Sequence, residues 1–365
     1  MGDLPRAAMK ALLLFFAAVA TAAEPKDLAS TLEPLREKYK LPACGVAVIE
    51  SGKITAIGVT GKRRLDRPTL ATTADLWHIG SCTKSMTAAV LAMLVDEGKL
   101  RWDMTVPESL PDIPAHAGWQ KVTLDHLVTQ RSGIARITSR QQLFFEGGNS
   151  SPSTQRVAFA EKILAAPPAQ DPGKFAYSNS GYGLLGAIIE HAADRSYEDL
   201  LRERIFEPLK LTTAGFGAPA KKGEWNPTQP WGHYRHEDIL SPATPSPDNQ
   251  FPPALSPAAC VHMSLADFAK YAWWISSNEP ALLKPDTFQK LKTPPKGSTY
   301  AGGMWLTELP GFGEPAVCHS GHMGGFFGVF YSTKKQACVA VFNTEGGGWE
   351  WLGDEIAAAA LKAAQ

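Results

Sequence analysis

The sequence has no excess of either charge: its 365 residues include 36 Lys plus Arg and 36 Asp plus Glu. A surface that binds nucleic acid or another polyanion is therefore not indicated, because such surfaces need clustered basic residues. Hydrophobic residues make up 44% of the chain and charged residues 20%, which is ordinary for a globular protein. This composition excludes a disordered, collagen-like or coiled-coil chain.

Cysteine is scarce, and its five copies are scattered: Cys44, Cys82, Cys260, Cys318 and Cys338. They are too few for a disulfide framework in a chain of this length, and an odd count leaves at least one thiol free. No Cys-x-x-Cys pair is present to suggest a zinc site. Cys44 and Cys338 both lie in strand-like runs, so the pattern permits a bridge between them without requiring it. We expect neither a metal nor an organic cofactor.

Long apolar runs are also missing, apart from one near the start of the chain. Arg6 and Lys10 precede the 13-residue run ALLLFFAAVATAA at 11–23. A bilayer-spanning helix needs about 20 apolar residues, so a retained membrane anchor is the weaker interpretation. Residues 1–23 are predicted to be a signal peptide cleaved after Ala22 or Ala23. The remaining domain, 24–365, is then secreted or periplasmic, with no stable membrane span.

The two ends of that domain have similar patterns. A helical pattern at 26–40 precedes a strand-like hairpin, whereas three strand-like runs and an alanine-rich helix end the chain. The middle is mostly helical in pattern. We therefore predict an α+β fold in which 24–80 and 295–365 build one antiparallel sheet flanked by helices, with a mainly helical subdomain, 81–294, inserted between them.

A proline-rich segment, 215–258, interrupts the helical part. It holds nine of the 28 prolines and has no sustained periodicity. Long irregular segments inside compact domains are usually functional or disordered, and the aromatic residues within this one favour an ordered wall near a cleft.

A candidate nucleophile lies at Ser81, where Ser81-Cys82-Thr83-Lys84 leads into a strong helical pattern. Residues three apart share a helix face, which brings the Lys84 amine beside the Ser81 hydroxyl. A four-residue pattern is weak evidence, because Ser332-Thr333-Lys334-Lys335 also fits it in a predicted turn between strands. On this pattern alone a helix cap is the favoured interpretation of Ser81.

Two further elements follow in order. Tyr177 and Asn179 precede another helical run, and both can face one cleft as proton acceptor and as anchor for a lysine or a substrate carbonyl. Residues 319–321 (His-Ser-Gly) lie in the first C-terminal strand. Gly321 would let a substrate approach the strand edge, and the amide of His322 could stabilise an oxyanion.

In this order, S-x-x-K, Y-x-N and H-x-G resemble the motifs of the serine β-lactamase and penicillin-binding protein superfamily, in particular its class C β-lactamase, D,D-peptidase and esterase branch. The stretches LDHLVTQRSGI, PGKFAYSNSGYGLLG, FEPLKLTTAGF and GHMGGFFGVF are similar to the same family. The resemblance covers roughly residues 28–363. It implies a β-lactamase/transpeptidase-like fold and no cofactor.

The resemblance also implies roles for the site residues. Ser81 would be the nucleophile, Lys84 would assist its deprotonation, and Tyr177 would be the general base. Asn179 would orient Lys84 and the substrate, and the backbone amides of Ser81 and His322 would form the oxyanion hole. His319, Ser320 and Gly321 would bind substrate together with Asn179.

Three departures from the family pattern bear on function. His319 replaces the lysine of K-T-G and is expected to be a weaker, pH-dependent cation, which places efficient β-lactam hydrolysis in doubt. H-x-G is similar to what certain D,D-peptidases, D-amino-acid amidases and esterases carry. Thr129-Gln130-Arg131-Ser132-Gly133 replaces the T-H-T-S-G pattern, and Ala258-Ala259-Cys260 replaces A-G-G. These two changes are expected to alter the cleft wall or loop packing.

The sequence predicts a serine hydrolase that forms an acyl-enzyme on a small-molecule or peptide ester or amide. A penicillin- or peptidoglycan-binding receptor without turnover, and a true β-lactamase, stay open as alternatives. A dinucleotide site at Gly181–Gly186 is disfavoured because those glycines fall within a helical pattern. No G-x-S-x-G elbow is present for an α/β-hydrolase. A metal site at His319 and His322 is disfavoured because side chains three apart on a strand point to opposite faces.

Overall fold

The computed structural model describes residues 24–135, 150–237, 239–345 and 349–365. The predicted signal peptide, 1–23, lies outside the described residues. Within them, no helix is both long enough and apolar enough to cross a membrane.

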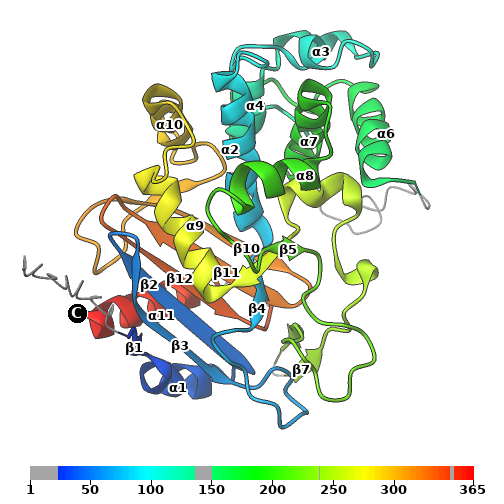
Figure 1. Ribbon diagram of the computed structural model, residues 1–365. Helices are drawn as coiled ribbons and strands as arrows, with labels where there is room; N and C mark the ends of the chain where they lie inside the picture. The colour runs from blue at the N-terminus through cyan, green and yellow to red at the C-terminus, as the bar shows by residue number, and fades with distance from the viewer. Residues whose placement is uncertain (1–23, 136–149, 238, 346–348) are drawn as a thin grey trace, which may run out of the picture.

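A seven-stranded sheet forms the base of the molecule (Figure 1), in the order β1-β3-β2-β12-β11-β10-β9. All neighbours are antiparallel except β1 and β3. The strands come from both ends of the chain: β1 (Lys26–Asp27), β2 (Ala43–Glu50), β3 (Lys53–Gly61), β9 (Trp305–Thr307), β10 (Ala316–Met323), β11 (Phe326–Ser332) and β12 (Gln336–Phe342). The pairing of β12 with β2 joins the two ends, which confirms the predicted sheet.

Helices cover both faces of this sheet. α1 (Ala29–Lys38) and α11 (Glu350–Ala364) pack on one face, where they bury one apolar cluster. α9 (Leu265–Ser277) packs on the other face against β2, β11 and β12. It comes from the segment predicted to be helical, so that segment contributes directly to the cover of the sheet. The α+β prediction is confirmed.

The helical layer stands above the sheet around α2 (Thr83–Asp96), which is buried from Thr83 to Leu94. Burial on all sides explains why α2 lacks a polar face. The surrounding helices are α3 (Val106–Ser109), α4 (Leu124–Val128), α6 (Pro152–Leu164), α7 (Asn179–Ala193), α8 (Tyr197–Leu201), a π-helical turn η3 (Arg202–Phe206) and α10 (Pro285–Lys292). A 3₁₀ turn, η2 (Ala117–Lys121), lies between α3 and α4.

The proline-rich segment contains short elements: β5 (Gly215–Phe216), β6 (His233–His236), β7 (Ile239–Pro242), and the 3₁₀ turns η4 (Pro247–Asn249) and η5 (Pro253–Ala258). β5 joins β4 (Leu76–His78) and β8 (Val261–Ser264) in a small sheet. His233 anchors the segment to the large sheet, since its Nδ1 lies 2.7 Å from the Asn343 carbonyl oxygen.

The disulfide that the sequence pattern allowed between Cys44 and Cys338 does not form. All five cysteines are free thiols. Cys338 stands opposite Val48 in the register of β12 and β2, whereas Cys44 stands opposite Phe342. The two thiols are therefore four residues apart along neighbouring strands, beyond the reach of a disulfide.

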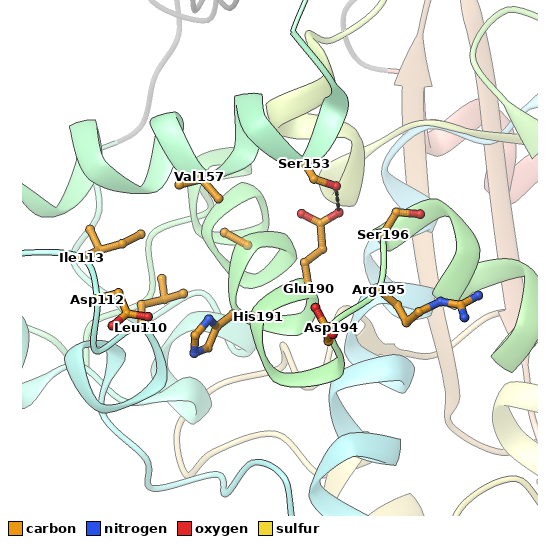
Figure 2. A pocket seen from close by; sticks show the side chains of 11 residues that line it. Leu110, Asp112, Ile113, Ser153, Val157, Glu190, His191, Asp194, Arg195 and Ser196 are labelled. Carbon is orange, nitrogen blue, oxygen red and sulfur yellow. Dashed lines mark hydrogen bonds between the residues drawn. The ribbon is translucent and has the colours of Figure 1, made fainter.

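A surface pocket of about 490 Å³ opens between α3, α6 and the end of α7. Figure 2 shows Leu110, Ile113 and Val157 on one side of it and Glu190 pointing toward Ser153 on the other. Glu190 is eleven residues along α7 from Asn179, which is about 16 Å of helix. The pocket is therefore separate from the predicted site.

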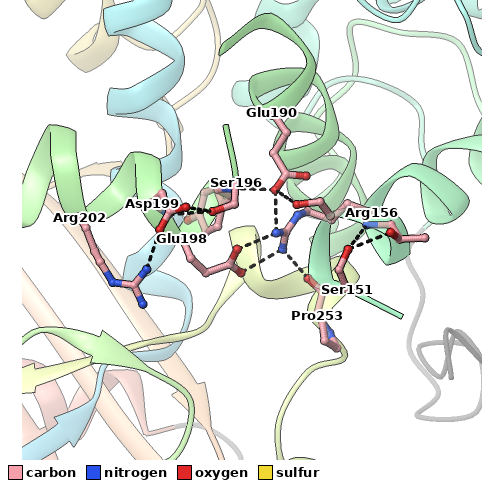
Figure 3. A network of polar contacts seen from close by, with 11 residues as sticks. Ser151, Arg156, Glu190, Ser196, Glu198, Asp199, Arg202 and Pro253 are labelled. Carbon is pink, nitrogen blue, oxygen red and sulfur yellow. Dashed lines mark hydrogen bonds and ion pairs between the residues drawn. The ribbon is translucent and has the colours of Figure 1, made fainter. Parts of the chain in front are cut away.

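Glu190 also belongs to a buried ionic network centred on Arg156 of α6 (Figure 3). The guanidinium is fully buried, and its Nη2 lies 2.7 Å from both Glu190 of α7 and Glu198 of α8. Its Nη1 donates to the backbone oxygen of Pro253 at 2.9 Å, at the start of η5. One side chain thus ties three helices to the turn that ends at Ala258.

We expect Arg156→Met to lower the free energy of unfolding by about 3–5 kcal/mol, because it leaves two largely buried carboxylates without their partner. Arg202→Met is the matched control: Arg202 pairs with Asp199 at 3.0 Å, but both side chains are about half exposed. It should cost about 0–0.5 kcal/mol. Denaturant unfolding measures both values, and equal effects would contradict the structural weight given to Arg156.

Candidate active site

Ser81 lies in a tight 3₁₀ turn, η1 (Gly80–Cys82), between β4 and the first turn of α2. Gly80 has φ of +51°, a left-handed conformation that favours glycine. The turn packs closely against β10: a Cβ on Gly321 would lie 2.2 Å from the Ser81 nitrogen, and one on Gly80 would lie 2.5 Å from the His322 nitrogen. These two glycines let the Ser81 and His322 backbones approach each other.

Lys84, on the first turn of α2, has its amine at the centre of the site. Its Nζ lies 3.0 Å from Ser81 Oγ, 2.8 Å from Asn179 Oδ1 and 2.8 Å from the Ala258 carbonyl oxygen. Burial lowers the pKa of the Lys84 amine well below its ordinary value and so favours the uncharged form.

An uncharged amine has two N–H donors and one lone pair, and the three neighbours match that set. Asn179 Oδ1 and the Ala258 oxygen can only accept hydrogen bonds, so they take the two N–H groups. The lone pair is left facing the Ser81 hydroxyl, which can donate. The arrangement is therefore suited to moving a proton from serine to lysine.

Tyr177 stands beside this amine, just before α7. The Lys84 Nζ lies 4.9 Å from the centre of its ring, and the rings of Tyr300 and His319 lie 6.1 and 6.2 Å away. Gln130 fixes the segment that carries Tyr177 through two hydrogen bonds. Its backbone oxygen accepts from the Ala176 N–H, and its side-chain oxygen accepts from the Ser178 N–H, both at 2.8 Å.

His319 faces the same site from β10 but is not a cation. Burial lowers the pKa of the His319 imidazole to about 3. Its Nδ1 lies 2.5 Å from the Ser320 oxygen and its Nε2 lies 3.5 Å from the Tyr300 hydroxyl. The expectation of a weak, pH-dependent cation is wrong because a dry site disfavours the imidazolium.

The structure thus brings Ser81, Lys84, Asn179, Tyr177 and His319 together, with the backbones of Gly321 and His322 against the serine turn. Ser320 contributes through its backbone oxygen, which contacts the His319 ring. Ser332, from the second S-x-x-K match, is at the other end of β11 and has no part in this cluster.

The sequence patterns missed several supporting groups. The Thr83 hydroxyl donates to the Gly80 oxygen at 2.8 Å and accepts from the Cys260 and Val261 N–H groups at 3.2 Å. It thereby fastens the chain after Ala258 to the serine turn. The Cys82 thiol donates to the His319 oxygen at 3.1 Å.

His78, three residues before Ser81, is another residue that the sequence patterns missed. It is fully buried at the end of β4, and its Nδ1 accepts the Gly80 N–H at 3.0 Å. Burial, and then the nearby His262, lowers the pKa of its imidazole to about 3, so the ring is neutral with its proton on Nε2. The sequence does contain a signal for His78, because an ionisable residue is unusual within an apolar run such as Leu76–Ile79.

The model of the family described as Beta-lactamase matches residues 28–364. Among curated proteins, the chain is similar to Protein flp of Staphylococcus aureus (strain N315), with 24% identity over 317 residues, 82% of this chain and 59% of that protein. It is also similar to the putative penicillin-binding protein PbpX of Bacillus subtilis (strain 168), with 26% identity over 268 residues, 73% of this chain and 61% of that protein. The chain therefore spans about three fifths of the length of these relatives.

Solved structures have the same fold. An octameric penicillin-binding protein homologue from Pyrococcus abyssi superimposes with a TM-score of 0.70 and 25% identity, covering 90% of this chain and 75% of that one. The D-amino acid amidase from Ochrobactrum anthropi SV3 gives a TM-score of 0.72 and 20% identity, covering 92% and 97%. Since the family model extends from α1 to the end of α11, the chain belongs to the Beta-lactamase family.

Proposed function

We propose that the protein is a serine hydrolase that forms an acyl-enzyme on Ser81 and acts on esters or amides, in the manner of the class C-like branch of its family. One observation carries the proposal: the buried Lys84 amine lies 3.0 Å from Ser81 Oγ and has two other acceptors, Asn179 Oδ1 and the Ala258 oxygen, for its N–H groups. We also propose that residues 1–23 direct export and are then removed.

In the acylation step, Ser81 Oγ attacks the substrate carbonyl carbon as its proton passes to Lys84 Nζ. The carbonyl oxygen becomes an oxyanion, which the backbone N–H groups of Ser81 and His322 stabilise; one such donor contributes about 3 kcal/mol in hydrolases. Lys84 passes this proton through the Tyr177 hydroxyl to the leaving group as the bond between the acyl carbon and the leaving group breaks. In deacylation, the oxygen of a water molecule attacks the acyl carbon as a water proton passes through the Tyr177 hydroxyl to Lys84 Nζ. Lys84 then returns the proton to Ser81 Oγ as the bond between Ser81 and the acyl carbon breaks, which restores both side chains.

The neutral state of His319 supports a substrate without a free carboxylate next to β10. A lysine at this position would offer a full positive charge, whereas His319 offers an uncharged ring. Neutral esters and amides therefore fit the site better than carboxylate-bearing D,D-peptides or penicillins. The relative described as a D-amino acid amidase accords with this substrate class.

We further propose that His78 is a positioning residue. Its Nδ1 holds the N–H of Gly80, the residue that turns the chain into Ser81. Because the pKa of the His78 imidazole is lowered to about 3, Nδ1 stays unprotonated near neutral pH and can accept the Gly80 N–H.

Ser81→Ala should abolish acyl transfer, and Lys84→Ala and Tyr177→Phe should each lower it by orders of magnitude, since each removes a group in the proton path. Ser332→Ala is the control and should change little. Intact-mass spectrometry with a fluorophosphonate, a penicillin and a p-nitrophenyl ester, beside product release, measures this. Unchanged turnover in Ser81→Ala would refute the site, and a persistent adduct without product would favour a receptor.

Lowering the pH from about 7.5 to about 5.5 should not improve the use of a carboxylate-bearing ester over its neutral analogue, because His319 stays uncharged in that range. An ordinary histidine, with a pKa of about 6.5, would gain charge there and attract the carboxylate. His319→Lys should raise the preference for the carboxylate. The ratio of kcat/KM for the two esters is the readout. A rise at low pH that His319→Gln removes would show that His319 titrates.

His78→Asn should keep most of kcat, because the asparagine side-chain oxygen can take the place of Nδ1 as acceptor for the Gly80 N–H. His78→Gln places its oxygen one bond further out and should lower kcat about ten-fold or more with little change in KM. A general loss of packing would affect both variants alike, so equal activities would count against a positioning role.

A further inference from the structure

A second pocket, of about 470 Å³, lies at the end of β10 and β11 that is remote from Ser81. Val317 pairs with Ser332 at this end, whereas Gly321, which packs on Ser81, pairs with Gly328. Four residues of β10 separate the two sites, which is about 13 Å along the strand. The pocket holds the second S-x-x-K match of the sequence, for which the proposed hydrolase has no use.

Ser332 is 1% exposed and lines this pocket. Its hydroxyl has no hydrogen-bond partner within the described part of the chain. A buried hydroxyl without a partner costs about 1–3 kcal/mol, so an unsatisfied one in a pocket wall is suited to bind a ligand atom.

Two lysines line the same pocket, Lys292 at the end of α10 and Lys334 in the turn after β11. Neither forms an ion pair with any carboxylate in residues 24–135, 150–237, 239–345 and 349–365. Burial, and then the charge of Lys334, lowers the pKa of the Lys292 amine to about 8. Lys292 is still largely charged at neutral pH, so the pocket holds two positive charges that repel each other.

The remaining polar lining is compatible with an anion. Gln289 keeps one amide N–H for a ligand, because the other donates to Thr293 Oγ1, whose own hydroxyl donates to the Gln289 backbone oxygen. The Lys292 amine donates to the Ser276 oxygen at 3.3 Å and lies 3.7 Å from the centre of the Phe288 ring. Glu314 is the one carboxylate in the lining. It offsets part of the charge without pairing with either lysine.

We propose that this pocket binds a phosphate group, held by the ammonium groups of Lys292 and Lys334 and by the hydroxyl of Ser332. Two positive charges match a phosphate dianion better than a carboxylate, and the orphan hydroxyl supplies a donor to a third oxygen. A second nucleophile is not indicated, because Ser332 forms no hydrogen bond to Lys334 or Lys335 within the described residues.

Isothermal titration calorimetry of the full chain with inorganic phosphate, at low ionic strength, tests the site. Lys292→Gln and Lys334→Gln should each weaken phosphate binding about ten-fold, and Ser332→Ala about three-fold. Lys335→Gln is the matched control, because Lys335 is the adjacent exposed lysine and lies outside the lining. It should change the affinity less than two-fold. Glu314→Gln should tighten binding.

Titrations with acetate and with glycerol phosphate show whether the pocket prefers phosphate over a carboxylate, and whether it accepts a phosphate ester as well as free phosphate. We expect acetate to bind more weakly than phosphate, and glycerol phosphate to bind if the site accepts a phosphate ester. Thermal unfolding of each variant establishes that it is folded, independently of any hydrolase activity. Equal weakening by Lys335→Gln and Lys334→Gln, or acetate binding as tight as phosphate binding, would overturn the proposal.

Discussion

The hydrogen bonds of one buried amine, Lys84 Nζ, impose the main constraint on this structure. The amine needs two acceptors and one donor within 3.0 Å, and these come from three places far apart in the chain: Asn179, Ala258 and Ser81. Burial inside α2 removes water as an alternative partner. The helices and turns that carry these groups must therefore meet at fixed positions, or the amine would be left unsatisfied at a cost of several kcal/mol.

The rest of the helical layer can be understood as support for those positions. Arg156 binds Pro253 at one end of η5, and the Thr83 hydroxyl binds the two N–H groups just beyond its other end, so the Ala258 oxygen is fixed from both sides. Gln130 performs the same task for the chain before Asn179. Both segments are those in which the sequence departs from the family pattern. Side-chain hydrogen bonds therefore hold both segments at the site in this chain.

Much of the fold and the site could be predicted from the sequence, because strand alternation, helical periodicity and short motifs are local signals. The positions of Ser81, Lys84, Tyr177 and Asn179 are local in this sense. The Ala258 oxygen was not predictable, since a backbone carbonyl has no sequence signature and depends on how η5 packs. The charge of His319 was predicted wrongly for a related reason: its pKa is set mainly by burial, which only the three-dimensional structure reveals.

The two S-x-x-K matches illustrate why backbone context decides chemistry. At Ser81 the motif begins a helix, so residues three apart lie on one face and the amine reaches the hydroxyl at 3.0 Å. At Ser332 the same pattern leaves a strand, and the Thr333 hydroxyl takes the backbone N–H of Lys335 to close a turn. Within the described residues, neither Lys334 nor Lys335 forms a hydrogen bond with the Ser332 hydroxyl. The same S-x-x-K pattern thus produces a pair of residues suited to proton transfer at Ser81, whereas at Ser332 it produces a serine in the wall of a separate pocket lined by lysines.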